Sequence, residues 1–243
     1  MLSQKPWKPE LVLRLLAGLF ASMLLGVLIV NGYESLAGEV GKRGRDIFIF
    51  IVGVFSFHGV GLVLVNVFLR QHEISWAAAF GFKSPRLGRT VFLAIVVGVF
   101  ILPIAWELSD LSAKALRFFQ MPVEQQTAVQ LMQNATSRWH LLFQGFAALI
   151  IAPFVEETIF RGILYPTIKQ LGFHKAALWG TSIFFALTHG NLMIFLPLVV
   201  LAIILTFLYE TTNNLLAPIV THSFFNAANF VYLLWLKHKS GSL

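Results

Sequence analysis

The chain has 243 residues, of which 57% are hydrophobic and 12% are charged, and its mean hydropathy is +0.77. Soluble domains carry about 25% charged residues, so this composition excludes an ordinary soluble protein. A core built by a chain of this length could not absorb so much apolar sequence, and most of the apolar surface must therefore face lipid. The sequence contains no cysteine, which excludes disulfides, iron–sulfur clusters, thiolate zinc sites and cysteine nucleophiles.

The net charge of +7 raises the question of a nucleic-acid partner. The 18 Lys and Arg residues lie between the apolar runs, however, and form no dense basic block. This distribution predicts contact with anionic lipid headgroups of a bilayer and argues against nucleic acid.

A helix needs roughly 20 apolar residues to cross the hydrocarbon core, and seven runs come near this length. The predicted spans cover residues 11–30, 47–69, 91–106, 141–165, 176–189, 192–209 and 215–236. We therefore expect an all-α, polytopic integral membrane protein with about seven transmembrane helices, forming a single membrane domain over residues 1–243. Lys and Arg almost balance between the two sets of loops, and only the compact cluster from Arg70 to Arg89 favours a cytosolic N-terminus.

One long polar stretch, residues 109–139, separates the third and fourth predicted spans. Its first part repeats apolar residues at helical spacing, with Lys114 and Arg117 beside them, which is typical of an amphipathic helix. We expect this stretch to lie along the membrane interface, and we prefer a lipid-facing role for it over that of a substrate gate.

Ionisable residues within apolar runs are costly and usually functional. Glu156 and Glu157 follow a long apolar run. On a helix, Glu157 and Arg161 face each other, while Glu156 points about 100° away. Arg161 can therefore neutralise Glu157, which leaves Glu156 to handle protons. The alternative is that both glutamates lie among the headgroups at a helix end.

Two histidines also interrupt apolar runs: His189 in the fifth span, and His222, which shares a helix face with Asn226. A rise of 1.5 Å per residue places Glu156 and His189 each roughly 21 Å from the turn at residues 170–175. His222 lies roughly 12–14 Å into the last helix, measured from the turn at residues 210–214. The sequence thus predicts a buried polar cluster in the C-terminal half, open toward the face that bears these two turns.

His58 and Asn66 lie two turns apart in the second span. We interpret them as residues that form hydrogen bonds between helices.

The sequence lacks the His-Glu-x-x-His motif of metalloproteases and the Gly-x-Ser-x-Gly motif of serine hydrolases. What remains is a Glu and a His that can deprotonate a water, with a second His and an Asn that can donate hydrogen bonds to an oxyanion. This set is suited to amide hydrolysis without a covalent intermediate.

Three motifs, in this order, resemble the CAAX-prenyl-protease and bacteriocin-processing family of glutamic intramembrane endopeptidases. They are Glu-Glu-x-x-x-Arg at Glu156, Glu157 and Arg161, Phe-x-x-x-His at Phe185 and His189, and His-x-x-x-Asn at His222 and Asn226. The resemblance covers a motif-bearing core of about residues 141–236.

The resemblance implies that Glu156 and His189 activate the attacking water, and that His222 and Asn226 stabilise the oxyanion. Glu157, Arg161 and Phe185 then act as supporting residues. No cofactor is required in this interpretation. Glu156, His189 and His222 could instead hold a zinc ion with one position open for water, which we keep as the alternative mechanism.

The implied substrate is a membrane-embedded or lipid-anchored peptide or protein. The compact length is similar to that of prokaryotic members, so we expect the protein in the cytoplasmic membrane of a prokaryote. Two other functions remain open: a proton-coupled transporter that uses the Glu/His cluster as a relay, and a catalytically inactive membrane scaffold. A transporter would be expected to carry paired repeats, and none is visible in the first half.

Overall fold

The computed structural model describes residues 2–36, 42–83, 85–135 and 137–239. Every regular element in these ranges is helical, so the predicted all-α fold is confirmed. The α-helices are α1 (Pro9–Leu36), α2 (Lys42–Gly53), α3 (Val60–Gln71), α4 (Trp76–Phe80), α5 (Leu87–Phe118), α6 (Thr127–Asn134), α7 (Arg138–Phe146), α8 (Ala152–Glu157), α9 (Tyr165–Gln170), α10 (His174–Leu187), α11 (Leu192–Thr212) and α12 (Leu216–Lys239). Three π-helical stretches are η1 (Val54–Gly59), η2 (Ala147–Ile151) and η3 (Thr158–Leu164).

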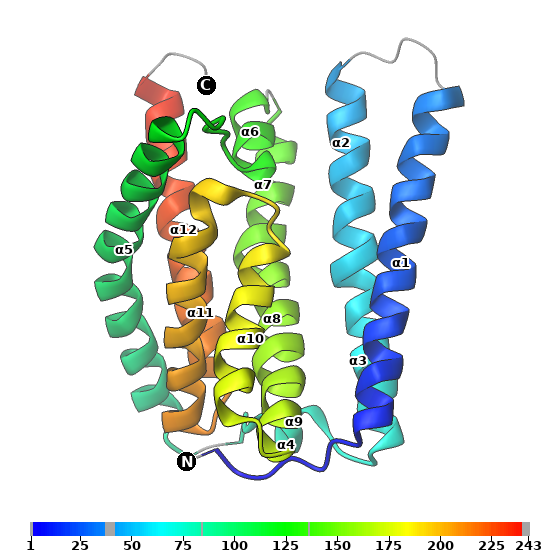
Figure 1. Cartoon of the computed structure of the whole chain (residues 1–243). Coiled ribbons are helices and arrows are strands. Elements are labelled where there is room, and N and C mark those ends of the chain that lie inside the picture. The colour runs from blue at the N-terminus through cyan, green and yellow to red at the C-terminus, as the bar shows by residue number, and fades with distance from the viewer. Residues whose placement is uncertain (1, 37–41, 84, 136, 240–243) are drawn as a thin grey trace. The chain divides into compact units, whose positions relative to one another are not determined.

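Contacts divide the chain into two compact units, and the first comprises residues 6–76. In it, α1 packs against the helical stretch α2–η1–α3 (Figure 1). The Ser22 hydroxyl donates to the Ser56 carbonyl over 2.8 Å, and Gly26 permits the close approach because a Cβ there would lie 2.3 Å from Ser56 Oγ. Asn66 accepts a 3.4 Å hydrogen bond from the Trp76 indole.

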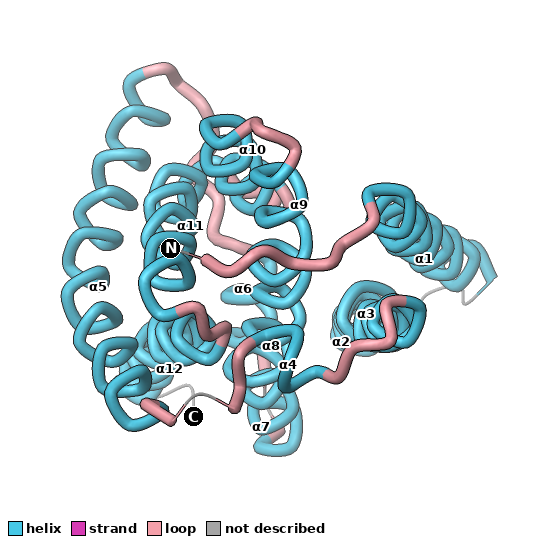
Figure 2. The backbone as a smooth tube through the Cα atoms, turned by 90° about the horizontal axis from the view of Figure 1, so that it is seen from below, coloured by secondary structure: helices cyan, strands magenta, loops and turns pink. Residues whose placement is uncertain are grey.

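The second unit comprises residues 77–243 together with residues 1–5, and it contains all three motifs. Helix α11 packs against α5, α10 and α12, as the view along the helices in Figure 2 shows. Leu201, Ala202, Leu205 and Tyr209 of α11 are fully buried. This helix therefore forms the centre around which the motif-bearing helices are arranged.

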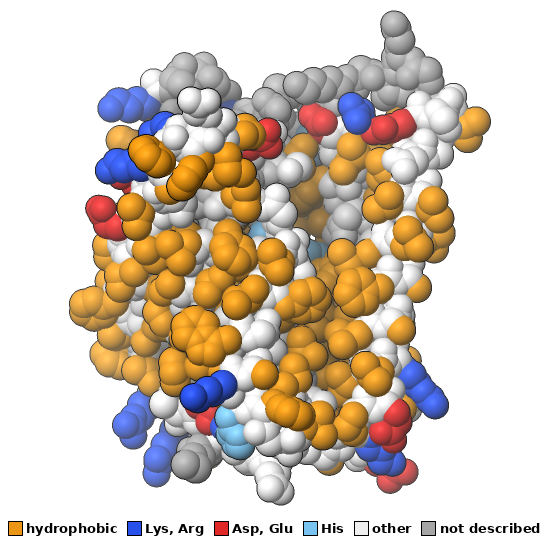
Figure 3. Space-filling model, in the orientation of Figure 1, with side chains coloured by type: hydrophobic (Ala, Val, Ile, Leu, Met, Phe, Trp, Pro, Cys, Tyr) orange, Lys and Arg blue, Asp and Glu red, His pale blue; other side chains and the backbone are white. Residues whose placement is uncertain are grey.

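In the part of the chain that the structure describes, five helices are long and apolar enough to cross a membrane: Pro9–Leu36, Gly44–Gln71, Leu87–Phe118, Leu192–Thr212 and Leu216–Lys239. Over the second unit, Figure 3 shows hydrophobic side chains along the middle of the helices and Lys and Arg side chains near both ends. These features make the chain an integral membrane protein.

The predicted number of seven spans is not confirmed. The remaining two predictions, residues 141–165 and 176–189, correspond to the helical stretch α7–α9 and to α10. Helix α10 has only 14 residues, so it rises about 21 Å, less than the hydrocarbon thickness of about 30 Å.

Helix α5 is longer than the predicted span 91–106, because it continues without a break to Phe118. Residues 109–118 therefore extend α5, and our expectation of a separate helix along the interface is wrong for them. With 32 residues the helix rises about 48 Å, so its charged last turns lie beyond the apolar layer. Further along the polar stretch, Lys237 of α12 donates a 3.2 Å hydrogen bond to the carbonyl of Met132 in α6.

The N-terminal residues lie against the end of α11 and against α4. The Leu2 N–H donates to Glu210 over 3.2 Å, and the Tyr165 hydroxyl donates to the same carboxylate over 2.9 Å. Lys5 is buried, which lowers the pKa of its amine below the usual value for lysine, and its Nζ donates to the Ala79 carbonyl over 2.9 Å. These contacts join the beginning of the chain to the motif-bearing unit.

A close backbone contact joins α4 to the turn between α11 and α12. Gly81 has a φ of +78°, and a Cβ on it would lie 2.3 Å from the carbonyl oxygen of Asn213. Beside it, the Leu215 N–H donates to the Phe80 carbonyl over 2.9 Å. The start of α12, which carries His222, is thus fixed by contacts that require a glycine.

We expect Gly81→Ala to destabilise the protein more than Gly172→Ala. Both glycines have positive φ, and an alanine there costs about 1–2 kcal/mol. Only Gly81 has backbone atoms in the way, since nothing lies within 4 Å of a Cβ on Gly172. Thermal unfolding of the detergent-solubilised variants measures the difference, and equal midpoints would contradict this account of the α4 contact.

Candidate active site

Both glutamates lie in one continuous helical stretch, from Arg138 to Gln170, which alternates between α and π geometry. The π-helices η2 and η3 flank the short helix α8, which ends at Glu157. Pro153 follows η2 and Pro166 follows η3. Because proline has no N–H, it interrupts the regular hydrogen bonding of a helix, and π stretches are frequent at functional sites.

Glu157 is fully buried, and two positive or proton-donating groups contact one of its oxygens. Arg161 Nη1 lies 2.9 Å from Glu157 Oε1, and His222 Nδ1 lies 2.9 Å from the same atom. The exposed fractions of Arg161 and His222 are 1% and 2%. The predicted pairing of Glu157 with Arg161 is therefore present, and the carboxylate also joins this helix to α12.

Phe185 of α10 packs against Arg161 and His222, the two partners of Glu157. The Arg161 guanidinium lies 4.4 Å from the centre of its ring, within the range of a cation–π contact. The rings of His189 and His222 lie 4.9 Å and 5.7 Å from it. Phe185 is thus the common neighbour of both histidines, so an aromatic residue one turn before His189 can pack against both imidazole rings.

Glu156 faces His189. Glu156 Oε2 lies 4.0 Å from His189 Nε2, and both side chains retain slight exposure, 12% and 16%. The other ring nitrogen, Nδ1, lies 2.9 Å from the Phe185 carbonyl. Since a carbonyl can only accept, Nδ1 carries the proton, and in the neutral ring Nε2 presents a lone pair toward Glu156.

His189 lies just beyond the end of α10, where the chain reverses into α11. Asn191 caps α11 by accepting from the Met193 and Ile194 N–H groups, and its amide donates to the Glu124 carbonyl over 3.0 Å. This end of α10 is therefore beside the loop that follows α5. The direction in which the cluster opens, expected toward the turns at residues 170–175 and 210–214, stays a prediction.

Asn226 lies one turn after His222 on α12, and its amide donates to the Ala148 carbonyl of η2 over 2.8 Å. An asparagine amide has two donors, so one N–H remains for another partner. The structure thus brings Glu156 to His189, and Glu157, Arg161 and His222 to one another around Phe185, while Asn226 lies further along α12. Sequence reasoning missed the contacts of Glu157 with His222 and of Asn226 with Ala148.

The zinc alternative requires Glu156, His189 and His222 to converge on one point. Among the described residues, no three His, Cys, Asp or Glu side chains form a group that could hold a metal ion. His222 instead directs Nδ1 to Glu157. In this structure these three side chains do not form one such group, and the zinc alternative stays a prediction.

We expect Arg161→Met to lower the free energy of unfolding by about 3–5 kcal/mol, because it leaves a buried carboxylate without its guanidinium. The double variant Glu157→Gln/Arg161→Met should recover part of this loss, since the uncompensated charge is then gone. Thermal unfolding in detergent measures both effects. Arg117→Met, at an exposed position of α5, is the matched control, and a midpoint equal to that of this control would refute the role of the pair.

Comparison with known proteins concerns the same part of the chain. Residues 138–228 match the family model described as "Type II CAAX prenyl endopeptidase Rce1-like". Two proteins of Lactococcus lactis are also similar: UPF0177 protein YxdF is 31% identical over 96 residues, and UPF0177 protein YaiF is 33% identical over 98 residues. The first match covers 39% of this chain and 52% of the relative, and the second covers 38% and 42%.

The chain thus spans about half the length of the curated relatives it matches. No solved structure matches the chain. The matched residues begin with α7 and include Glu156, His189 and His222. Through residues 138–228 the chain matches the Rce1-like type II CAAX prenyl endopeptidases, and the family resemblance predicted from its motifs is confirmed.

Proposed function

We propose that the protein is an intramembrane endopeptidase, which hydrolyses a peptide bond of a membrane-associated peptide or protein by means of an activated water. The observation that carries this proposal is the approach of Glu156 Oε2 to His189 Nε2, at 4.0 Å. The match of the surrounding helices to a family of CAAX prenyl endopeptidases supports it.

The distance between Glu156 and His189 suits a water that bridges them. Two acceptors 4.0 Å apart can each receive a hydrogen bond of about 2.8 Å from one water. Both hydrogens of this water are then engaged, and an oxygen lone pair remains to attack a carbonyl carbon. Glu156 takes the proton as the water attacks, and the same proton later reaches the departing amine.

The tetrahedral intermediate carries a negative oxygen that needs hydrogen-bond donors. His222 can supply one from Nε2 when both ring nitrogens carry protons, and the Glu157 carboxylate at Nδ1 balances the charge of that imidazolium. The second N–H of Asn226 is the other donor. Because these donors are held by contacts present before the substrate binds, little reorganisation is needed during the reaction.

Glu157, Arg161 and Phe185 support the site and do not themselves react. Glu157 fixes the ring orientation of His222, and Arg161 holds the carboxylate in place. The Phe185 backbone sets the tautomer of His189 through its carbonyl, while its ring separates the two histidines. The Phe-x-x-x-His motif thus contains one residue for chemistry and one for orientation.

The substrate we expect is a membrane-embedded or lipid-anchored peptide or protein. Helix α12, which carries His222 and Asn226, is long and apolar enough to cross a membrane, so we expect the substrate to reach the site from the bilayer. A transporter relay or an inactive scaffold predicts that no peptide bond is cleaved, which separates both from the endopeptidase.

The experiment is membrane proteomics on cells that express wild-type protein, Glu156→Gln or Glu107→Gln. Glutamine keeps the size of Glu156 but cannot take a proton, so peptide termini formed by the enzyme should decrease at least about 100-fold. Glu107 is exposed on α5, and its variant is expected to cleave like wild type. The thermal midpoints of all three proteins should agree.

Termini that form equally in the Glu156→Gln strain would contradict the catalytic role of Glu156. If no terminus depends on the wild-type protein at equal abundance, the endopeptidase function itself fails, and the scaffold or transport functions become preferable.

A further inference from the structure

The register of η2 and the position of Pro153 leave one backbone carbonyl without a regular donor in its own helix. The Ala152 N–H donates to the Ala147 carbonyl, which is the i to i−5 pattern of a π-helix. In this register the Ala148 carbonyl would accept from residue 153, which is a proline and has no N–H. Pro153 thereby leaves the Ala148 carbonyl available to another donor.

Asn226 supplies that donor, since its Nδ2 lies 2.8 Å from the Ala148 oxygen. Within a membrane, a carbonyl without a partner costs several kcal/mol because no water replaces the missing bond. The pairing therefore satisfies the carbonyl and at the same time restrains the amide of Asn226. One N–H of that amide is fixed, which sets the direction of the other.

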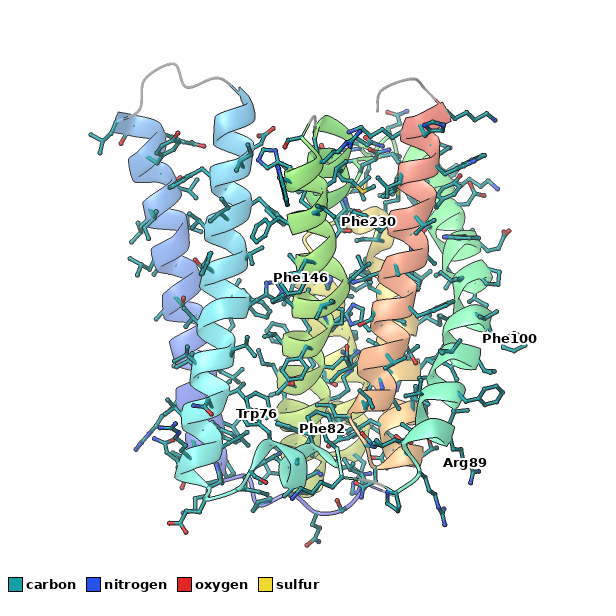
Figure 4. All side chains as sticks on the ribbon, turned by 180° about the vertical axis from the view of Figure 1, so that it is seen from behind. Trp76, Phe82, Arg89, Phe100, Phe146 and Phe230 are labelled. Atoms are coloured by element: carbon teal, nitrogen blue, oxygen red, sulfur yellow. The ribbon has the colours of Figure 1, made fainter. Side chains whose placement is uncertain are left out.

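Close packing of α12 against the same helix keeps the two groups at this distance. A Cβ on Gly145 would lie 3.2 Å from Cζ of Phe230, one turn beyond Asn226, and Figure 4 shows Phe230 between these helices. Helix α12 contacts both η2 and α8. The backbone of α12 is therefore held independently of the hydrogen bond, so the bond serves mainly to orient the side chain.

We propose that Pro153 is a positioning residue for Asn226: by withholding an N–H from the Ala148 carbonyl, it makes this carbonyl the acceptor that orients the amide. The inference rests on the proposed function for the role of Asn226 as an oxyanion donor. The orientation itself depends only on the contacts of Pro153, Ala148 and Asn226.

The chain contains a matched control for this proline. Pro166 follows η3 in the same way as Pro153 follows η2. In both places the residue before the proline makes an i to i−5 bond, here from the Tyr165 N–H to the Phe160 carbonyl. Pro166 is buried, as Pro153 is, but lies about 20 Å further along the helix from Asn226. Replacing either proline restores an N–H, and only Pro153 should affect Asn226.

The first measurement is a thermal double-mutant cycle on the full chain in detergent, with Pro153→Ala, Asn226→Ala and their combination. In wild type, Asn226→Ala leaves the Ala148 carbonyl without a donor and should lower the midpoint by about 2–4 °C or more. In the Pro153→Ala background the new N–H of residue 153 donates to this carbonyl. There, Asn226→Ala should lower the thermal midpoint by less than half as much as in wild type. Pro166→Ala should show no such coupling with Asn226→Ala.

The second measurement is the rate at which termini that depend on Glu156 appear in membranes of the same strains. Pro153→Ala should reduce this rate by about 10- to 100-fold at an equal or higher thermal midpoint, because the amide loses its restraint. With Asn226→Ala already present, Pro153→Ala should cause no further loss, since it acts through that side chain.

Additive thermal effects of Pro153→Ala and Asn226→Ala would overturn the proposal, whatever the activity. The proposal also fails if Pro153→Ala lowers the activity by the same factor whether Asn226 is present or replaced by alanine. The proline would then act by another route. If the thermal coupling is present but wild type forms no termini, the orientation is supported and the proposed function fails.

Discussion

The Glu157 carboxylate is the interaction on which the site depends, because it joins helices from two distant parts of the sequence within an apolar layer. A buried charge in such a layer has no water to solvate it, so its partners must come from the protein. Arg161 supplies a neutralising charge from the next turn, and His222 supplies an N–H from α12. Any displacement of α12 would cost this carboxylate one of its two partners, so the same contact that satisfies the charge also fixes the histidine.

The adjacent glutamates divide two tasks that one residue could not perform together. Glu157 is fully buried and engaged with two partners, whereas Glu156, about 100° away on the helix, faces His189 and retains some exposure. A base must reach water and exchange a proton, and a structural counter-ion must do neither. Consecutive positions on one helix provide both environments, because each residue faces a different neighbouring helix.

Local spacing predicted part of this arrangement. The four-residue interval between Glu157 and Arg161 was enough to predict their pairing, and the depth estimate correctly placed Glu156 and His189 at similar depth. The bond from His222 to Glu157 could not be predicted, because helical rise gives the depth of a residue but not which helix it faces. Helix α5 is longer than the apolar run predicts, because the charged residues that follow this run include no proline or glycine before Phe118 and the helix continues through them. The π stretches also change which side chains share a helix face, and a count at 3.6 residues per turn does not include this change.

Pro153 and Pro166 each follow one of the π stretches, and a proline at this place removes a backbone donor from the helix. A proline within a helix costs about 3 kcal/mol, mainly through a lost hydrogen bond and a clash with the preceding turn. In water the freed carbonyl would be solvated, but in an apolar layer it remains a strong acceptor that only another protein group can satisfy. Such a carbonyl can hold a side chain more rigidly than packing alone, because the hydrogen bond has a preferred direction and no competing solvent. In the helix that carries both glutamates, a carbonyl without a donor in its own helix thus orients a polar side chain of the neighbouring helix α12.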